Sequence, residues 1–284
     1  MSRIWNDIKG EYAFGGPETR LIIINVAIFI VSALYFAFVK VSGFPAWLAL
    51  RPDVVLYYPW TVITYSFLHA NFMHILSNML VLNFSARLFR TYFTSRQFLG
   101  VYFLGAIFAA LVYIANYFIF NAGNGLVGAS AAVMAVLVAI TTYNPTMQVR
   151  LLLIGNVKLW IITGFLIFLD LISIPAASSV SHLSHLSAAL FGFMYMKLLQ
   201  NGTDLSRIFT SVVDFFTNLF RPSQKTKFKK VHRNYDTKAN QKTGTITIKD
   251  KTQQQIDEIL DKISRSGYDS LTKEEKDFLF RAGK

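Results

Sequence analysis

The stretch LVGASAAVMAVLVAITT at residues 126–142 decides the fold, because it is apolar, free of charge and carries Ser130 near its start. A helix needs about 20 residues to cross a hydrocarbon core of ~30 Å, so this stretch is short for a span. Ser130 lies eleven residues before Thr141, which is about 17 Å along a helix at 1.5 Å per residue. The sequence therefore predicts a helix that begins inside the membrane, with Ser130 in its first turn.

The composition of the whole chain is that of a membrane protein. Of its 284 residues, 53% are hydrophobic and 15% are charged, whereas about a quarter are charged in a typical soluble protein. Because it has no cysteine, disulfides, zinc sites with thiolate ligands and a cysteine nucleophile are excluded. The expected fold is an all-α membrane protein, a six-helix bundle with its apolar stretches at residues 21–39, 60–86, 97–120, 126–142, 158–174 and 182–199.

The connections between these stretches alternate in charge. Residues 41–59 offer Arg51 as their only basic side chain, and residues 121–125 and 175–181 have no charge. The N-terminal segment and the connections after the second, fourth and sixth stretches are basic, with Arg3, Lys9, Arg20, Arg87, Arg90, Arg96, Arg150, Lys158 and Lys197. Since cytoplasmic loops carry the excess of Lys and Arg, both termini are expected in the cytoplasm.

The chain is expected to divide into four segments. They are a cytoplasmic N-terminal segment at 1–20, the membrane domain at 21–200, a basic polar linker at 201–250 and a small helical hairpin at 251–284. The linker is predicted either to attract anionic lipid or to be solvated. In the hairpin, Gly267 suits the end of one helix, and Thr272 with Glu275 suits a capping box for the next.

Polar residues of three stretches fall at one depth. His185 lies twelve residues before Lys197, about 18 Å along a helix. His74 and Asn78 precede Arg87 by thirteen and nine residues, about 20 and 14 Å. Polar groups are costly in lipid, so they are expected to face a bundle interior or a water-filled cavity.

The chemistry of these groups indicates acyl transfer. A serine hydroxyl is a weak nucleophile until a base takes its proton, and histidine is the usual base. Ser130 is therefore the candidate nucleophile and His185 the candidate base. Asn78, His74 and the Ser130 amide, at a helix N-terminus, are candidate donors to an oxyanion. No carboxylate is expected near His185, so a dyad is predicted.

Each of these residues also has a structural interpretation. A serine in a membrane helix usually bonds to its own backbone, and a buried His or Asn often links two helices. These interpretations would all have to hold independently, which favours a catalytic site. His69 and His182 are expected to be structural, His182 near the cavity mouth. Asp170 is expected to line the cavity or to cap a loop.

Three strings of the chain resemble the rhomboid family of intramembrane serine proteases. They are PWTVITYSFLHANFMHILSNML at 59–80, GAS at 128–130 and SHLSHLSAALFG at 181–192, and the resemblance covers about residues 17–200. It implies a six-helix bundle, a Ser130–His185 dyad and an oxyanion site from Asn78, His74 and the Ser130 amide. The string DEILDKISRSGYDSLTKEEKDFLF at 257–280 is similar to an extension of rhomboid-like proteins from Bacteroidetes-type bacteria, which implies the bacterial inner membrane.

The chain departs from the family pattern at several points. Ala131 and Ala188 stand where the family usually has glycine, and both keep the residue small, so that helices can still approach closely. Met134 replaces an aromatic residue one turn after the serine. The first external loop lacks the family's Trp-Arg pair, which affects loop packing and substrate entry more than the dyad.

The resulting hypothesis is an intramembrane serine endopeptidase that cleaves transmembrane helices near the outer membrane face. Its expected partners are transmembrane protein substrates and the lipid bilayer, with no nucleic acid, cofactor or metal, and the oligomeric state is left open. One alternative is a catalytically silent rhomboid-like protein that binds transmembrane helices. Another is a small transporter, against which the sequence shows no inverted repeat.

Overall fold

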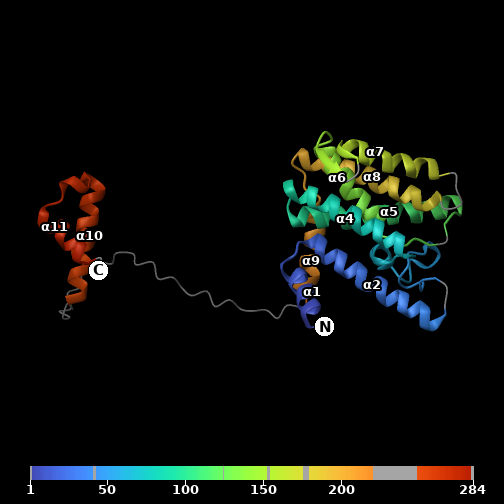
Figure 1. Ribbon diagram of the computed structural model, residues 1–284, viewed down its shortest axis with the longest axis horizontal. Coiled ribbons are helices and arrows are strands. Elements are labelled where there is room, and N and C mark those ends of the chain that lie inside the picture. The colour runs from blue at the N-terminus through green and yellow to red at the C-terminus, as the bar shows by residue number, and fades with distance from the viewer. Residues whose placement is uncertain are drawn as a thin grey trace. The chain divides into compact units, whose positions relative to one another are not determined.

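The computed structural model describes residues 2–40, 43–123, 125–151, 154–174, 179–219 and 248–282. The chain forms two compact units, Met1–Pro222 and Ser223–Lys284. The structure of the first unit is mostly helical (Figure 1). Its elements are α1 Ser2–Phe14, α2 Pro17–Val39, η1 Pro52–Val54, α3 Thr61–Thr64, η2 Tyr65–Phe67, α4 Phe72–Tyr92, α5 Ser95–Phe120, α6 Ser130–Tyr143, β1 Gln148–Leu151, β2 Gly155–Lys158, α7 Leu159–Ser173, α8 Ser179–Gln200 and α9 Ser206–Leu219.

The first unit has the helices of a membrane bundle. Within the described residues, α2, α4 and α5 are long and apolar enough to cross a membrane, and α6 and α7 are shorter apolar helices. This agrees with the expected all-helical membrane fold. The number of spans and their orientation stay predictions, since they depend on where the bilayer lies.

Helix α6 forms the centre of the bundle. It packs against α4, α5, α7 and α8, and every side chain from Ala131 to Ile140 is buried. The other helices of the bundle therefore cover most of the surface of α6. The helix begins at Ser130, as the sequence predicts.

Small residues let two neighbours approach α6 at the same level. A Cβ atom added at Gly105 of α5 would lie 2.5 Å from the Cβ of Ala135. A Cβ atom added at Gly192 of α8 would overlap the carbonyl oxygen of Ala135. The backbone of α8 therefore contacts the backbone of α6 at Ala135, and the backbone of α5 contacts the Ala135 methyl group. Small residues permit such close contacts between membrane helices.

The hydropathy of the second apolar stretch suggests a single helix from residue 60, but the structure differs. Instead, α3 and η2 are followed by an extended residue, Leu68 (φ −96°, ψ 141°), and α4 begins only at Phe72. The side chain of Asn71 caps α4 by accepting a hydrogen bond of 2.9 Å from the His74 amide. A local cap of this kind defines a helix start inside an apolar run.

Part of the predicted linker at 201–250 is helical. Helix α9 packs on α5, where the rings of Phe103 and Phe209 stack 5.1 Å apart at 8°. The carboxylate of Asp204 accepts a hydrogen bond of 2.9 Å from the Ser206 amide at the start of α9. Burial raises the pKa of Asp204, but hydrogen bonds from Ser206 and Gln97 lower it by more. The pKa of Asp204 therefore lies below its usual range. Residues 220–247 of the predicted linker lie outside the described residues.

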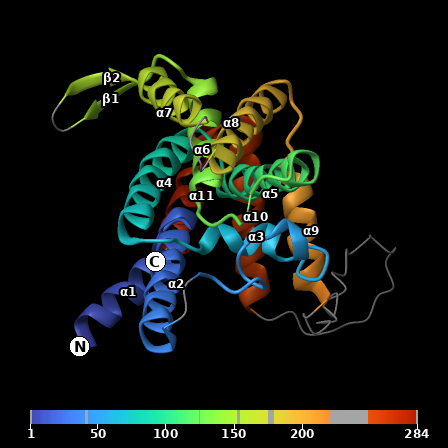
Figure 2. The same cartoon turned by 90° about the vertical axis from the view of Figure 1, so that its right-hand side faces the viewer.

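The connection between α6 and α7 contains an antiparallel hairpin that the sequence analysis does not predict. Strands β1 and β2 pair Gln148 with Lys158 and Leu151 with Gly155. Figure 2 shows this hairpin extending away from the helices. Its strands are only four residues long, the shortest length at which an alternating pattern indicates a strand.

In the described part of the second unit, α10 Ile248–Ser266 and α11 Lys273–Ala282 are joined through η3 Tyr268–Ser270. Helix α10 ends as predicted at Gly267, which has φ +78° and whose amide donates to the Ile263 carbonyl oxygen at 2.8 Å. The predicted capping box is also present, with hydrogen bonds of 2.7 and 3.3 Å between Thr272 and Glu275. The ammonium group of Lys262, 2.8 Å from Glu275, holds the pKa of that carboxyl below its usual range.

The close packing at Gly192 gives a stability prediction. Gly192→Ala should lower the free energy of unfolding by about 1–3 kcal/mol, because the new methyl group must push α8 away from α6. The matched control is Gly164→Ala in α7, since a Cβ atom there meets nothing within 4 Å. Thermal unfolding of both variants in detergent checks this, and equal midpoints for the two would contradict it.

Candidate active site

The hydroxyl of Ser130 and the imidazole of His185 lie in direct contact. Ser130 Oγ is 2.6 Å from His185 Nε2, within hydrogen-bond distance. The two residues come from α6 and α8, which are held together by the close approach at Gly192. When the other ring nitrogen carries the proton, Nε2 accepts a hydrogen bond from the serine hydroxyl.

One cavity contains all four residues that the sequence singles out. Its volume is about 300 Å³, and its lining includes His74, Asn78, Ser130 and His185. These residues come from three helices, α4, α6 and α8. Much of the remaining lining is apolar, with Val81, Val133, Met134, Leu137, Leu166 and Leu169. Such a cavity, apolar with a few convergent polar groups, is typical of a binding or catalytic site.

His74 turns one ring nitrogen toward the start of α6. Its Nδ1 accepts a hydrogen bond of 3.4 Å from the Ala70 amide, which leaves the proton on Nε2 in the neutral ring. A Cβ atom added at Gly128 would lie 2.7 Å from His74 Nε2 and 3.5 Å from Ser130 Oγ. Gly128 also has φ +128°, a conformation that favours glycine. Gly128 thus leaves open the space between the imidazole and the serine.

Asn78 is fixed by its own helix. Its side-chain nitrogen donates a hydrogen bond of 2.8 Å to the His74 carbonyl oxygen, one turn earlier in α4. An amide nitrogen carries two hydrogens, so this bond orients the group and leaves a second donor. Asn78 and His74 therefore present N–H groups to the cavity that also contains Ser130.

The segment before Ser130 is anchored to the bundle. The Gly128 amide donates to the Tyr65 carbonyl oxygen at 2.9 Å, and Leu126 forms a two-bond bridge with Leu50. The Gly125 amide donates to the Tyr113 hydroxyl at 2.9 Å. These bonds fix the position at which α6 begins, and the first amide groups of a helix have no acceptor within that helix.

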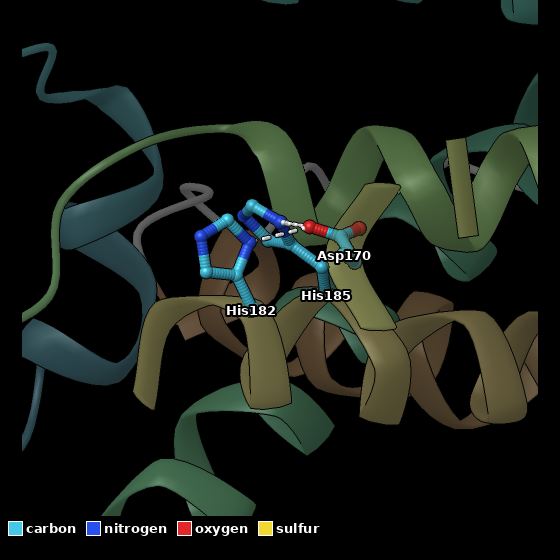
Figure 3. Close-up of side chains that lie close together, drawn as sticks. All are labelled: Asp170, His182 and His185. Carbon is cyan, nitrogen blue, oxygen red and sulfur yellow. Dashed lines mark hydrogen bonds and ion pairs between the residues drawn. The ribbon is translucent and has the colours of Figure 1, made fainter. Parts of the chain in front are cut away.

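A carboxylate lies next to His185, which corrects the expectation that none is present there. Asp170 Oδ1, on α7, is 2.9 Å from His185 Nδ1. Figure 3 shows both rings, those of His182 and His185, directed at this carboxylate. The sequence did contain a signal for this contact. Asp170 is twelve residues after Lys158, and His185 is twelve residues before Lys197, so both are expected at the same distance from the basic end of their helix. The sequence could not show that Asp170 faces α8 rather than lipid.

His182 and His69, both expected to be structural, differ in their surroundings. His182 Nδ1 is 2.7 Å from the same Asp170 oxygen. The ring of His69 lies 5.1 Å from that of His74, and its two nitrogens are buried without a hydrogen-bond partner among the described residues. Asp170, His182 and His185 together have the donor types of a metal site, with their ligand-type atoms within 4.8 Å of one another.

The residues that depart from the family pattern are buried around the site. Ala131 and Ala188 are 2% and 0% exposed, so their small size serves close helix packing. Met134 is buried and lines the cavity with Leu166. The region one turn after Ser130 is therefore filled by a flexible thioether side chain, which adapts to its neighbours.

Comparison with known families adds two matches. Residues 58–201 match the Rhomboid domain, and residues 247–282 match a family of unknown function, DUF6576. No curated protein matched the chain. The rhomboid family consists of intramembrane serine proteases. Because the Rhomboid match covers just over half of the chain and includes both Ser130 and His185, the protein belongs to the rhomboid family.

Proposed function

We propose that the protein is an intramembrane serine endopeptidase that cleaves transmembrane-helix proteins near the outer membrane face. The observation that carries this proposal is the distance of 2.6 Å between Ser130 Oγ and His185 Nε2 at a partly apolar cavity. A buried serine with only a structural role would instead bond to its own helix backbone.

The reaction begins with the hydroxyl of Ser130. Its oxygen attacks the carbonyl carbon of the scissile peptide bond, while His185 Nε2 takes the hydroxyl proton. The imidazolium then gives this proton to the leaving amine as the peptide bond breaks, which leaves an acyl-serine. A water molecule, deprotonated by the same nitrogen, then attacks the ester carbon. The imidazolium returns the proton to Ser130 Oγ as the ester bond breaks, which releases the carboxylate product and restores the hydroxyl.

Asp170 is a positioning residue in this scheme, acting through His185. Its carboxylate accepts the Nδ1 proton of His185 at 2.9 Å, which places the free electron pair on Nε2, facing Ser130. The same carboxylate stabilises the imidazolium that forms during attack. The arrangement extends the predicted Ser130–His185 dyad to a chain of three groups.

The developing oxyanion is assigned to three donors. The Ser130 amide stands at the first position of α6, where the helix dipole is positive. The Asn78 amide group and His74 Nε2 reach the same cavity from α4. Donors fixed in advance around the site of developing charge lower the barrier without reorganisation.

The proposed membrane placement has two sources. The basic connections support a cytoplasmic location of both termini and six spans, and the resemblance of the C-terminal string supports a bacterial inner membrane. The substrates are then membrane proteins whose helices unwind locally near the outer face to expose a peptide bond. The proposed segments are the N-terminal 1–20, the membrane domain 21–200, a linker that follows α9 and the C-terminal hairpin.

The central prediction concerns Ser130 and His185. In a reconstituted assay with a single-span substrate, Ser130→Ala and His185→Ala should abolish cleavage, because nucleophile and base act as a unit. The control Ser187→Ala, also on α8, should keep activity, since its hydroxyl donates to the Ser184 carbonyl oxygen at 2.8 Å.

A fluorophosphonate probe gives a second measurement on the same variants. Labelling should occur at Ser130 in the wild type and in Ser187→Ala, and should disappear in Ser130→Ala. Equal cleavage by wild type and both site variants would rule out the protease. A chain that neither cleaves nor labels would favour the silent helix-binding alternative.

The oxyanion assignment predicts a selective loss. Asn78→Ala should reduce kcat by about 10²–10³-fold with little change in KM, because the donor acts mainly in the transition state. The control Ser77→Ala lines the same cavity, but its hydroxyl is directed to the His74 carbonyl oxygen at 3.1 Å. A similar loss of kcat in both variants would contradict the assignment.

The positioning role of Asp170 predicts a different pattern. Asp170→Asn should lower kcat and the rate of probe labelling together, by about 10²–10⁴-fold, because His185 can then adopt the wrong tautomer. KM should stay close to the wild-type value, and Asp170→Glu should recover part of the rate. Unchanged labelling kinetics in Asp170→Asn would show that the carboxylate does not act through His185.

A further inference from the structure

Three ligand-type side chains meet beside the proposed catalytic pair. Asp170 of α7 and His182 and His185 of α8 converge through Asp170 Oδ1 and the two Nδ1 atoms (Figure 3). His182 and His185 are three residues apart on one helix, so they share a face. Their side chains are 25% and 20% exposed, and that of Asp170 is 10% exposed. The cluster is therefore sheltered but not fully enclosed by protein.

His182 has no part in the proposed proteolysis. Its Nδ1 nevertheless lies 2.7 Å from the oxygen that also contacts His185. A single carboxylate oxygen is enough to position His185, so the second imidazole has to be explained by something else. Two imidazoles and one carboxylate form a ligand set that zinc commonly takes, with a fourth position left for water.

The spacing of the three atoms suits such an ion. They lie within 4.8 Å of one another, whereas tetrahedral zinc with bonds of about 2.0–2.2 Å holds its ligand atoms roughly 3.3 Å apart. To hold the ion, the two Nδ1–Oδ1 distances of 2.7 and 2.9 Å would widen slightly, and a pair as far apart as 4.8 Å would move closer. We propose that Asp170, His182 and His185 bind Zn²⁺, and that the bound ion inhibits the protease.

Inhibition follows from the two nitrogens of one ring. With Asp170 accepting the Nδ1 proton, His185 presents a free electron pair at Nε2 to Ser130. With Zn²⁺ on Nδ1, the neutral ring carries its proton on Nε2 and donates it to the neighbouring group, here Ser130 Oγ at 2.6 Å. A ring in that state does not take the serine proton. The ion also withdraws Asp170 from its positioning role.

The inhibitory effect rests on the proposed function, but the metal site can be tested without it. Zn²⁺ is titrated calorimetrically into the full-length Ser130→Ala chain, purified in detergent without a histidine tag. One ion per chain is expected. Adding His182→Gln, which keeps a donor to Asp170 but removes the imidazole, should weaken binding at least about tenfold, since even residues that only support metal ligands are worth 10–100-fold.

Two further variants make the titration specific. His232→Ala removes a histidine from outside the described residues and should leave the affinity unchanged. His182→Cys supplies a thiolate, another zinc ligand, and should restore binding. Equal affinity in the parent, His182→Gln and His232→Ala chains would overturn the site, as would a failure of Zn²⁺ to bind the parent.

The inhibition is measured as cleavage with Zn²⁺ relative to cleavage without it, so that the basal rate of each variant cancels. The concentration for half-inhibition should rise at least about tenfold in His182→Gln, and EDTA should restore wild-type cleavage. Binding without inhibition, or equal inhibition of both chains, would overturn the inhibitory role. Zinc-insensitive cleavage would overturn the inhibitory role and leave the protease intact. His182-dependent binding by an inactive chain would support the metal site and overturn the proposed protease.

Discussion

The close approach of α6 and α8 is the constraint on which the site depends. At Gly192 the absence of a side chain lets α8 lie against the Ala135 carbonyl oxygen, and Gly105 allows α5 a similar approach from another side. This packing sets the distance between Ser130 and His185. A hydrogen bond of 2.6 Å leaves no room for an extra methyl group between the helices, because a displacement of about 1 Å takes it beyond the usual range.

The second determinant is the state of one imidazole. His185 contacts Ser130 through Nε2 and Asp170 through Nδ1, and a neutral ring has one proton for the two nitrogens. Whatever occupies the Nδ1 side therefore decides whether Nε2 accepts or donates. With the Asp170 carboxylate at Nδ1, Nε2 accepts the serine proton, whereas with the proposed zinc ion at Nδ1, Nε2 carries a proton of its own. As a ligand of that ion, His182 would affect the chemistry at Ser130 without taking part in the reaction.

Several features could be predicted from residues close together in the chain. The start of a short helix at Ser130 followed from the length of the apolar stretch, and α6 does begin there. Gly267 and the Thr272–Glu275 pair followed from local turn and capping chemistry. The prediction was wrong for residues 60–71, where a cap at Asn71 interrupts an apolar run. It also missed α9, whose packing on α5 depends on a partner far away in the chain.

By itself, the sequence indicated the membrane class, the helical architecture and the family, and it predicted that the polar groups lie at similar positions along their helices. These depend on composition, local strings and the fixed rise of a helix. The tertiary structure decided that Asp170 faces His185, that His182 shares its carboxylate, and that His74 points past Gly128 toward Ser130. The physical reason is rotation: the rise per residue fixes depth along a helix axis, whereas the face a side chain presents to another helix is set by the packing of the whole bundle.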